Sequence, residues 1–150
     1  MINDSGWSIS HTLIGSIKHY LPTGSVILEF GSGVGTGRLI RQGYNLLSVE
    51  QDFNYINKFH NNYCHATIKD GWYDLEVLHE FLKDKEYDAI LIDGPASPGS
   101  RMGILEAKID LNKTIFIDDI DRPKDRELFY ILSEGRKSED NEFFGVILDD

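Results

Sequence analysis

Short apolar runs alternate with more polar segments along most of the chain. The runs, rich in Val, Ile and Leu, predict buried strands over residues 26–30, 45–50, 63–68, 87–92, 114–117 and 142–148. The segments between them, several bounded by Ser, Gly or Pro, predict helices over residues 8–20, 36–42, 53–61, 74–84, 101–109 and 123–135. Strands that alternate with helices predict an α/β fold, with a doubly wound, mostly parallel sheet flanked by helices.

The first predicted strand ends in an acid and a glycine-rich turn. In sheets of this kind ligands bind beyond the carboxyl ends of the strands, so the residues after each strand are the candidate site. The turn from Gly31 to Thr36 lets the backbone approach a ligand closely, and the following helix directs free N–H groups toward it. A dinucleotide fingerprint that begins at Gly31 needs glycine where Thr36 stands. Glu29 would face the pocket, where it repels a pyrophosphate and favours an amino-bearing or cationic ligand.

The second predicted strand also ends in an acid. Glu50 lies 19 residues after Gly31, which is the spacing at which an acid accepts hydrogen bonds from both hydroxyls of a ribose. The alternative is a solvated acid at a strand end. Together, the glycine turn and Glu50 predict a nucleoside-containing ligand without a pyrophosphate.

The sequence Glu29-Phe30-Gly31-Ser32-Gly33-Val34-Gly35 resembles the first motif, E/D-x-G-x-G-x-G, of class I S-adenosylmethionine-dependent methyltransferases. The resemblance implies that Glu50 binds the ribose of S-adenosylmethionine. It implies that the amino-acid part of this cofactor lies near Glu29 and the turn formed by Gly31, Ser32, Gly33 and Thr36. It also implies cofactor contacts for Gln51, Asp70, Trp72 and Asp93.

Two adjacent aromatic residues follow the third predicted strand, where the resembled family borders the adenine. Trp72 and Tyr73 lie beside Gly71 and suit a stacking face for the base. The alternative interpretation is that both side chains anchor the loop to the core. The sequence leaves these two interpretations open.

Acidic residues follow the fourth and fifth predicted strands. Neighbouring strands lie ~4.8 Å apart, so Asp93 is expected close to Asp118 and Asp119. Carboxylates ~4 Å apart repel by about 4 kcal/mol at an effective dielectric constant of about 20, so the group requires a cation or a proton. Oxygen ligands suit Mg²⁺ or Ca²⁺. The alternative is that the acids cap the next helix or pair with Arg101 and Arg122.

This acidic group resembles the metal site of catechol-type, metal-dependent O-methyltransferases. Asp93 and Asp118 match two metal ligands of that family, and Asp119 stands where the family has an asparagine. Ala96 stands where the family has a lysine that acts as a base. The resemblance therefore implies Mg²⁺ on Asp93, Asp118 and Asp119 and assigns acceptor activation to Asp93, with the identity of the base open.

Length and charge narrow the class of partner. The 150 residues predict a single domain over 1–150, and the net charge of −10 without a cluster of Lys and Arg disfavours nucleic acid. No apolar run of ~18 residues predicts a membrane span. Residues 1–5 lack the basic flank and apolar core of a secretion signal, and a single cysteine, Cys64, fits a reducing, cytoplasmic compartment.

The expected activity is methyl transfer from S-adenosylmethionine to a small-molecule or sugar-like acceptor. An oxygen atom of the acceptor is favoured over a nitrogen atom as the site of methylation. The resembled family ends in a hairpin of two antiparallel strands, and only residues 143–148 remain for one. The sequence therefore predicts a sheet shortened at its C-terminus, with the acceptor lid missing, truncated or supplied by another subunit. The last of these options favours a homo-oligomer. The alternatives are a non-catalytic S-adenosylmethionine- or nucleoside-binding module and, with less support, a nicotinamide-dependent oxidoreductase.

Overall fold

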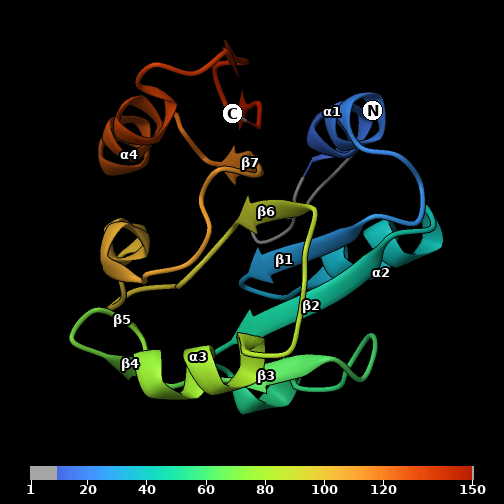
Figure 1. Ribbon diagram of the computed structural model, residues 1–150, viewed down its shortest axis with the longest axis vertical. Coiled ribbons are helices and arrows are strands. Elements are labelled where there is room, and N and C mark those ends of the chain that lie inside the picture. Colours follow the sequence, from blue (N-terminus) through green and yellow to red (C-terminus); the bar gives the residue numbers. More distant parts are fainter. Residues whose placement is uncertain (1–9, 150) are drawn as a thin grey trace.

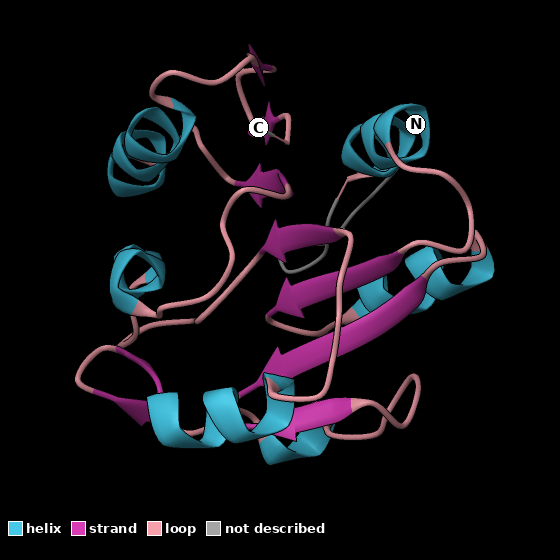
Figure 2. Ribbon diagram, viewed as in Figure 1, coloured by secondary structure: helices cyan, strands magenta, loops and turns pink. Residues whose placement is uncertain are grey.

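The computed structural model describes residues 10–149, which form a seven-stranded sheet with helices on both faces (Figures 1 and 2). Five strands pair in parallel: β1 (Val26–Phe30), β2 (Asn45–Glu50), β3 (Tyr63–His65), β6 (Ala89–Ile92) and β7 (Thr114–Asp118). The sheet order is β3-β2-β1-β6-β7-β9-β8. The order reverses between β1 and β6, which is where such sheets bind ligands.

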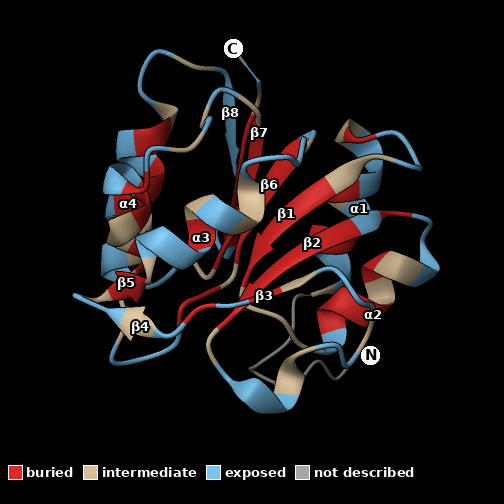
Figure 3. Cartoon of the chain, turned by 60° about the horizontal axis from the view of Figure 1, so that its bottom comes forward, coloured by how far each residue is buried: buried red, intermediate tan, exposed pale blue. Residues whose placement is uncertain are grey.

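Alternate residues of the strands enter two separate cores, one on each face of the sheet. Leu28 belongs to a core with α3 (Leu75–Leu82), α4 (Pro123–Ser133) and the 3-10 turn η2 (Arg101–Glu106). Ile27 belongs to the opposite core with α1 (His11–Tyr20) and α2 (Val34–Arg41). Figure 3 shows the buried strands between helices whose outer surfaces are exposed. Because both faces are covered, the central strands have the mostly apolar runs that the sequence displays.

Helix α1 begins at His11, because the Leu13 N–H donates to the Oγ of Ser10 at 3.1 Å. Ser10 is thus the cap, while the first residues of the predicted 8–20 helix lie outside the described part of the chain. Among residues 10–149, no helix is long and apolar enough to cross a membrane.

Three predicted elements differ from the structure. The predicted helix over 53–61 is a single 3-10 turn, η1 (Phe53–Tyr55), and Asn57 soon adopts a left-handed backbone with φ of 58°. The predicted helix over 101–109 is the 3-10 turn η2. The predicted strand over 63–68 divides into β3 and a separate hairpin of β4 (Ile68–Lys69) and β5 (Trp72–Tyr73). Asp70 and Gly71, both with positive φ, form the turn of that hairpin.

The C-terminal hairpin is present, contrary to the expected loss of one strand. β9 (Phe144–Ile147) runs antiparallel to both β7 and β8 (Ser138–Asp140). All three residues of β8 are exposed and polar, so no apolar pattern indicates an edge strand there. The complete hairpin removes the reason for expecting a shortened sheet, and with it the argument for a homo-oligomer that was drawn from the shortening.

Candidate functional site

A cavity of about 460 Å³ lies at the carboxyl ends of the central parallel strands. It brings together six residues that the sequence predicted as a site: Gly31, Ser32, Gly33, Glu50, Gln51 and Asp93. It is also lined by Val34, Tyr55 and Gly94, which the sequence analysis did not single out. Gly94 directly follows Asp93 in a loop rich in Pro and Gly, so the sequence did contain a signal that this residue borders the site. Tyr55 lies in a segment expected to be helical, so its place was not predictable.

The turn after β1 requires glycine at its first position. Gly31 has a φ of +91°, and its N–H donates to the Val49 carbonyl at 2.8 Å. A Cβ on Gly31 would lie 2.9 Å from the Gly94 nitrogen and 3.0 Å from the Asp93 carbonyl carbon. The turn therefore packs directly against the loop after β6, and the floor of the cavity is backbone against backbone.

The Glu50 carboxylate is held at the edge of this cavity by the backbone on either side. Its Oε1 accepts a hydrogen bond from the Ser32 N–H at 2.8 Å, and its Oε2 accepts one from the Asp52 N–H at 2.7 Å. Each carboxylate oxygen has capacity for a further donor. A fixed carboxylate with acceptor capacity left is suited to a vicinal diol such as that of a ribose.

Glu29 lies beneath the glycine turn and does not line the cavity, unlike the expectation that it faces the ligand. Its Oε1 accepts hydrogen bonds from the hydroxyls of Thr36 and Ser48, both at 2.6 Å. Thr36 Oγ1 in turn accepts from the Gly33 N–H at 3.1 Å. Burial raises the pKa of Glu29 to about 7, although these hydrogen bonds oppose the rise. Glu29 and Thr36 thus support the turn from behind.

Replacing Glu29 by glutamine should remove a pH-dependent loss of stability. The pKa of Glu29 rises from an ordinary 4.5 to about 7, so the folded protein holds this proton more tightly than the unfolded chain. Its contribution is fully present below pH 4.5 and is lost as the pH rises through about 7, because the buried carboxyl group must ionise. The shift corresponds to about 3 kcal/mol.

The measurement is urea unfolding of wild type and Glu29→Gln at pH 5 and pH 8. The free energy of unfolding of the variant relative to wild type should increase by about 2–3 kcal/mol between these two conditions. Any structural cost of the amide cancels in this comparison. An equal difference at both pH values would show that Glu29 does not titrate in this range.

Two of the residues after β3 that the sequence assigned to the cofactor, Asp70 and Trp72, do not line the first cavity. Asp70 and Trp72 line a second cavity of about 340 Å³, whereas Tyr73 borders both cavities. The Trp72 ring is buried, with its centroid 5.2 Å from that of Phe30, and a Cβ on Gly103 would lie 2.5 Å from Trp72 Cβ. These contacts favour the interpretation of Trp72 as an anchor of the core. Gln51 does reach the first cavity, where its Oε1 accepts the Ala96 N–H at 3.2 Å.

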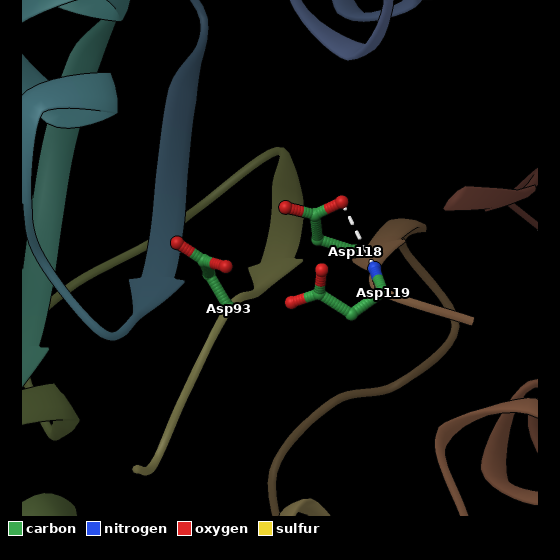
Figure 4. A group of neighbouring side chains, drawn as sticks. All are labelled: Asp93, Asp118 and Asp119. Atoms are coloured by element: carbon green, nitrogen blue, oxygen red, sulfur yellow. Dashed lines mark hydrogen bonds between the residues drawn. The ribbon is translucent and has the colours of Figure 1, made fainter. Parts of the chain in front are cut away.

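The acidic group forms as the strand order predicts. One carboxylate oxygen from each of Asp93, Asp118 and Asp119 lies within 4.8 Å of the other two, beyond the ends of β6 and β7 (Figure 4). Burial and the charge of Asp118 raise the pKa of Asp93 well above its usual range. Burial and the charge of Asp119 raise the pKa of Asp118 to about 6. Ionising all three carboxylates is therefore unfavourable unless a positive charge lies beside them.

A guanidinium already lies against these carboxylates. The Nη2 of Arg101 is 3.1 Å from Asp119 Oδ2 and 3.7 Å from Asp93 Oδ1. Its Nη1 donates to the Asp118 carbonyl oxygen at 2.6 Å. Arg122, which is more exposed, also pairs with Asp119 at 3.3 Å. Three carboxylates are a suitable donor set for Mg²⁺, and Arg101 already places a positive charge against two of the three.

No protein-family model and no curated protein sequence matches the chain. Solved structures do. A TehB-like S-adenosylmethionine-dependent methyltransferase from Corynebacterium glutamicum is 18% identical with a TM-score of 0.55, over 93% of this chain and 86% of that one. The C-terminal domain of precorrin-6Y C5,15-methyltransferase from Rhodobacter capsulatus is 14% identical with a TM-score of 0.55, over 85% of this chain and 72% of that one.

MycE methyltransferase of the mycinamycin biosynthetic pathway, solved with Mg and S-adenosylhomocysteine, is 12% identical with a TM-score of 0.52. The match covers 89% of this chain and 43% of MycE. None of these three is a catechol-type enzyme, so that resemblance stays a prediction. At sequence identities this low, the similarity shows the fold alone. The chain has the fold of class I S-adenosylmethionine-dependent methyltransferases.

Proposed function

We propose that the chain is a single domain that binds S-adenosylmethionine in the 460 Å³ cavity and transfers its methyl group to an acceptor. One observation supports this most directly. The Gly31 turn and the Glu50 carboxylate lie in one cavity at the point where the strand order reverses. In this proposal Glu50 binds the ribose, and the turn over Ser32 and Gly33 lies against the methionine part.

The proposed acceptor is a small molecule, with oxygen favoured over nitrogen. A net charge of −10 disfavours a nucleic acid. S-adenosylmethionine, when bound, supplies a methyl group on a positively charged sulfur. The residues of the chain bind and orient the reactants, and positioning provides most of the rate in such a displacement.

Asp93 is proposed to orient the acceptor and to take its proton. It borders the cavity, and burial and the charge of Asp118 raise its pKa, which makes its carboxylate a stronger base. The acceptor oxygen then forms a bond to the methyl carbon as the bond from that carbon to sulfur breaks. No step in this proposal passes through Mg²⁺, because Arg101 contacts the carboxylates that would bind it.

Isothermal titration calorimetry with the purified protein tests the binding step. We expect S-adenosylhomocysteine to bind saturably and NAD not to bind. Binding of NAD alone would favour the oxidoreductase alternative. The absence of heat with either S-adenosylmethionine or its demethylated product would overturn the proposal.

An assay of methyl transfer separates an enzyme from a binding module. S-adenosylmethionine labelled on its methyl group is offered with a panel of catechols, sugars and amines, and an enzyme should label at least one of them.

Once an acceptor is identified, Asp93→Asn should lower kcat by about 10²–10³-fold, because the amide cannot take a proton. Its affinity for S-adenosylhomocysteine should change by less than about tenfold. Asp121→Asn is the matched control, since Asp121 is an exposed acid after the neighbouring strand. Equal rates for wild type and Asp93→Asn would exclude Asp93 as the base.

A further inference from the structure

Arg101 is the most buried charged cation at the acidic group. Its side chain is 6% exposed, and it interacts with groups from three elements. Besides Asp93, Asp119 and the Asp118 carbonyl, its Nη1 lies 3.8 Å from Asp125 Oδ1 in the first turn of α4. The guanidinium therefore joins the ends of β6 and β7 to the start of α4.

Local packing holds Arg101 in this position. The turn η2 begins after Ser100, whose Oγ accepts the Met102 N–H at 3.3 Å and whose own N–H donates to the Gly71 carbonyl at 2.6 Å. Gly103 packs against the Trp72 ring, and Ile104 is fully buried. These contacts fix the backbone from which the Arg101 side chain extends.

Arg101 and a divalent cation would interact with the same carboxylates. Mg²⁺ binds carboxylate oxygens at 2.0–2.1 Å in a near-octahedral shell and retains several waters. An ion shared by Asp93 and Asp119 would lie beside the guanidinium Nη2 that already contacts both. A planar guanidinium carries five donors in a fixed geometry, so it can contact two carboxylates and a backbone carbonyl at once.

We propose that the guanidinium of Arg101 holds the position of a divalent cation at the Asp93–Asp118–Asp119 group, so that the site functions without a metal and Arg101 is a positioning residue for Asp93. That Arg101 takes the place of a divalent cation depends only on these contacts. That it positions Asp93 for catalysis rests on the proposed function.

Calorimetric titration with MgCl₂ and CaCl₂ tests the assignment without an assay of activity. Wild type should show no saturable binding at millimolar concentrations of either ion. Arg101→Met, which vacates the acidic group, should bind at least about tenfold more tightly than wild type. The added Asp119→Asn change should abolish this gain.

Arg122→Met is the matched control. Arg122 pairs with the same Asp119 but its side chain is 57% exposed, so its removal should not create a divalent-ion site. Saturable Mg²⁺ binding by wild type that Asp119→Asn abolishes would overturn the proposal, and so would a folded Arg101→Met variant that binds no more tightly than wild type. Where Arg101→Met does not fold, the titration of wild type decides alone.

Two further measurements separate this inference from the proposed function. S-adenosylhomocysteine should bind Arg101→Met about as well as wild type, because Arg101 does not line the cofactor cavity. If wild type binds no S-adenosylhomocysteine, the proposed function fails while the metal titrations still decide the role of Arg101. Where methyl transfer is measurable, it should persist in EDTA; loss of activity that Mg²⁺ restores would overturn the proposal.

Discussion

Replacing Glu50 by alanine should reduce the affinity for S-adenosylhomocysteine by about 10²–10⁴-fold. Hydrogen bonds to a charged acceptor contribute about 1.5–3 kcal/mol each, and a ribose diol offers two. Because the backbone N–H groups of Ser32 and Asp52 already fix this carboxylate, little conformational freedom is lost when the ligand binds. Calorimetry with wild type and variant gives the ratio of dissociation constants.

Glu50 also accepts hydrogen bonds from two backbone N–H groups, so a loss of binding must be separated from a loss of structure. Glu50→Gln keeps the length of the side chain and one acceptor oxygen, and its affinity should lie between those of wild type and Glu50→Ala. Glu80→Gln is the control for charge alone, because Glu80 is exposed and pairs only with Lys83 among the contacts of residues 10–149. A Glu50→Ala variant that is folded and binds S-adenosylhomocysteine as tightly as wild type would remove the basis of the proposed cofactor site.

The central strands were predictable because they are buried on both faces. The bounds of β1 and β2 agree with the apolar runs over 26–30 and 45–50, and β7 extends one residue further than predicted. Because both faces of the sheet are covered, each run is mostly apolar and ends where the chain turns. The same logic placed Glu50 and Asp93 at strand ends, and hence in one cavity.

Elements that depend on contacts distant in sequence were not predictable. β8 is polar because it is an exposed edge strand, and its pairing with β9 is what defines it. The sequence predicted that Glu29 faces the ligand, whereas hydroxyl donors from Thr36 and Ser48 hold it in the interior, and residue type alone does not reveal those donors. Trp72 suits stacking and anchoring equally well in sequence, and its contact with Gly103 favours anchoring.

The position of the acidic group was predictable from the sequence, but the source of its counter-charge was not. Strand adjacency predicted that Asp93 lies near Asp118 and Asp119, and the distances agree. Sequence left open whether a metal or an arginine balances the charge. The turn η2, expected as a longer helix, places Arg101 against two of the carboxylates. Proximity of like charges is thus readable from topology, whereas the counter-ion depends on loop packing.

Replacing Gly31 by alanine should lower the free energy of unfolding by about 3 kcal/mol or more. A positive φ costs an alanine about 1–2 kcal/mol, and crowding against well-packed neighbours typically adds about 1–3 kcal/mol. Here the neighbours are the Gly94 nitrogen and the Asp93 carbonyl, at 2.9 and 3.1 Å from the added carbon, and backbone atoms cannot rotate away. The loops after β1 and β6 must separate, which also deforms the cavity, so S-adenosylhomocysteine binding should be lost. Urea unfolding measures the first effect and calorimetry the second.

Gly24 supplies the matched control for this prediction. Its φ of +94° is close to the +91° of Gly31, but an added Cβ would meet no atom within 4 Å. Gly24→Ala therefore carries the backbone strain without the clash and should cost about 1–2 kcal/mol, while binding of S-adenosylhomocysteine stays unchanged. The difference between the two variants isolates the close contact between the glycine turn and the loop that bears Asp93. Equal destabilisation by both substitutions would show that the two loops tolerate separation, and the cavity would then not depend on the absence of a side chain at position 31.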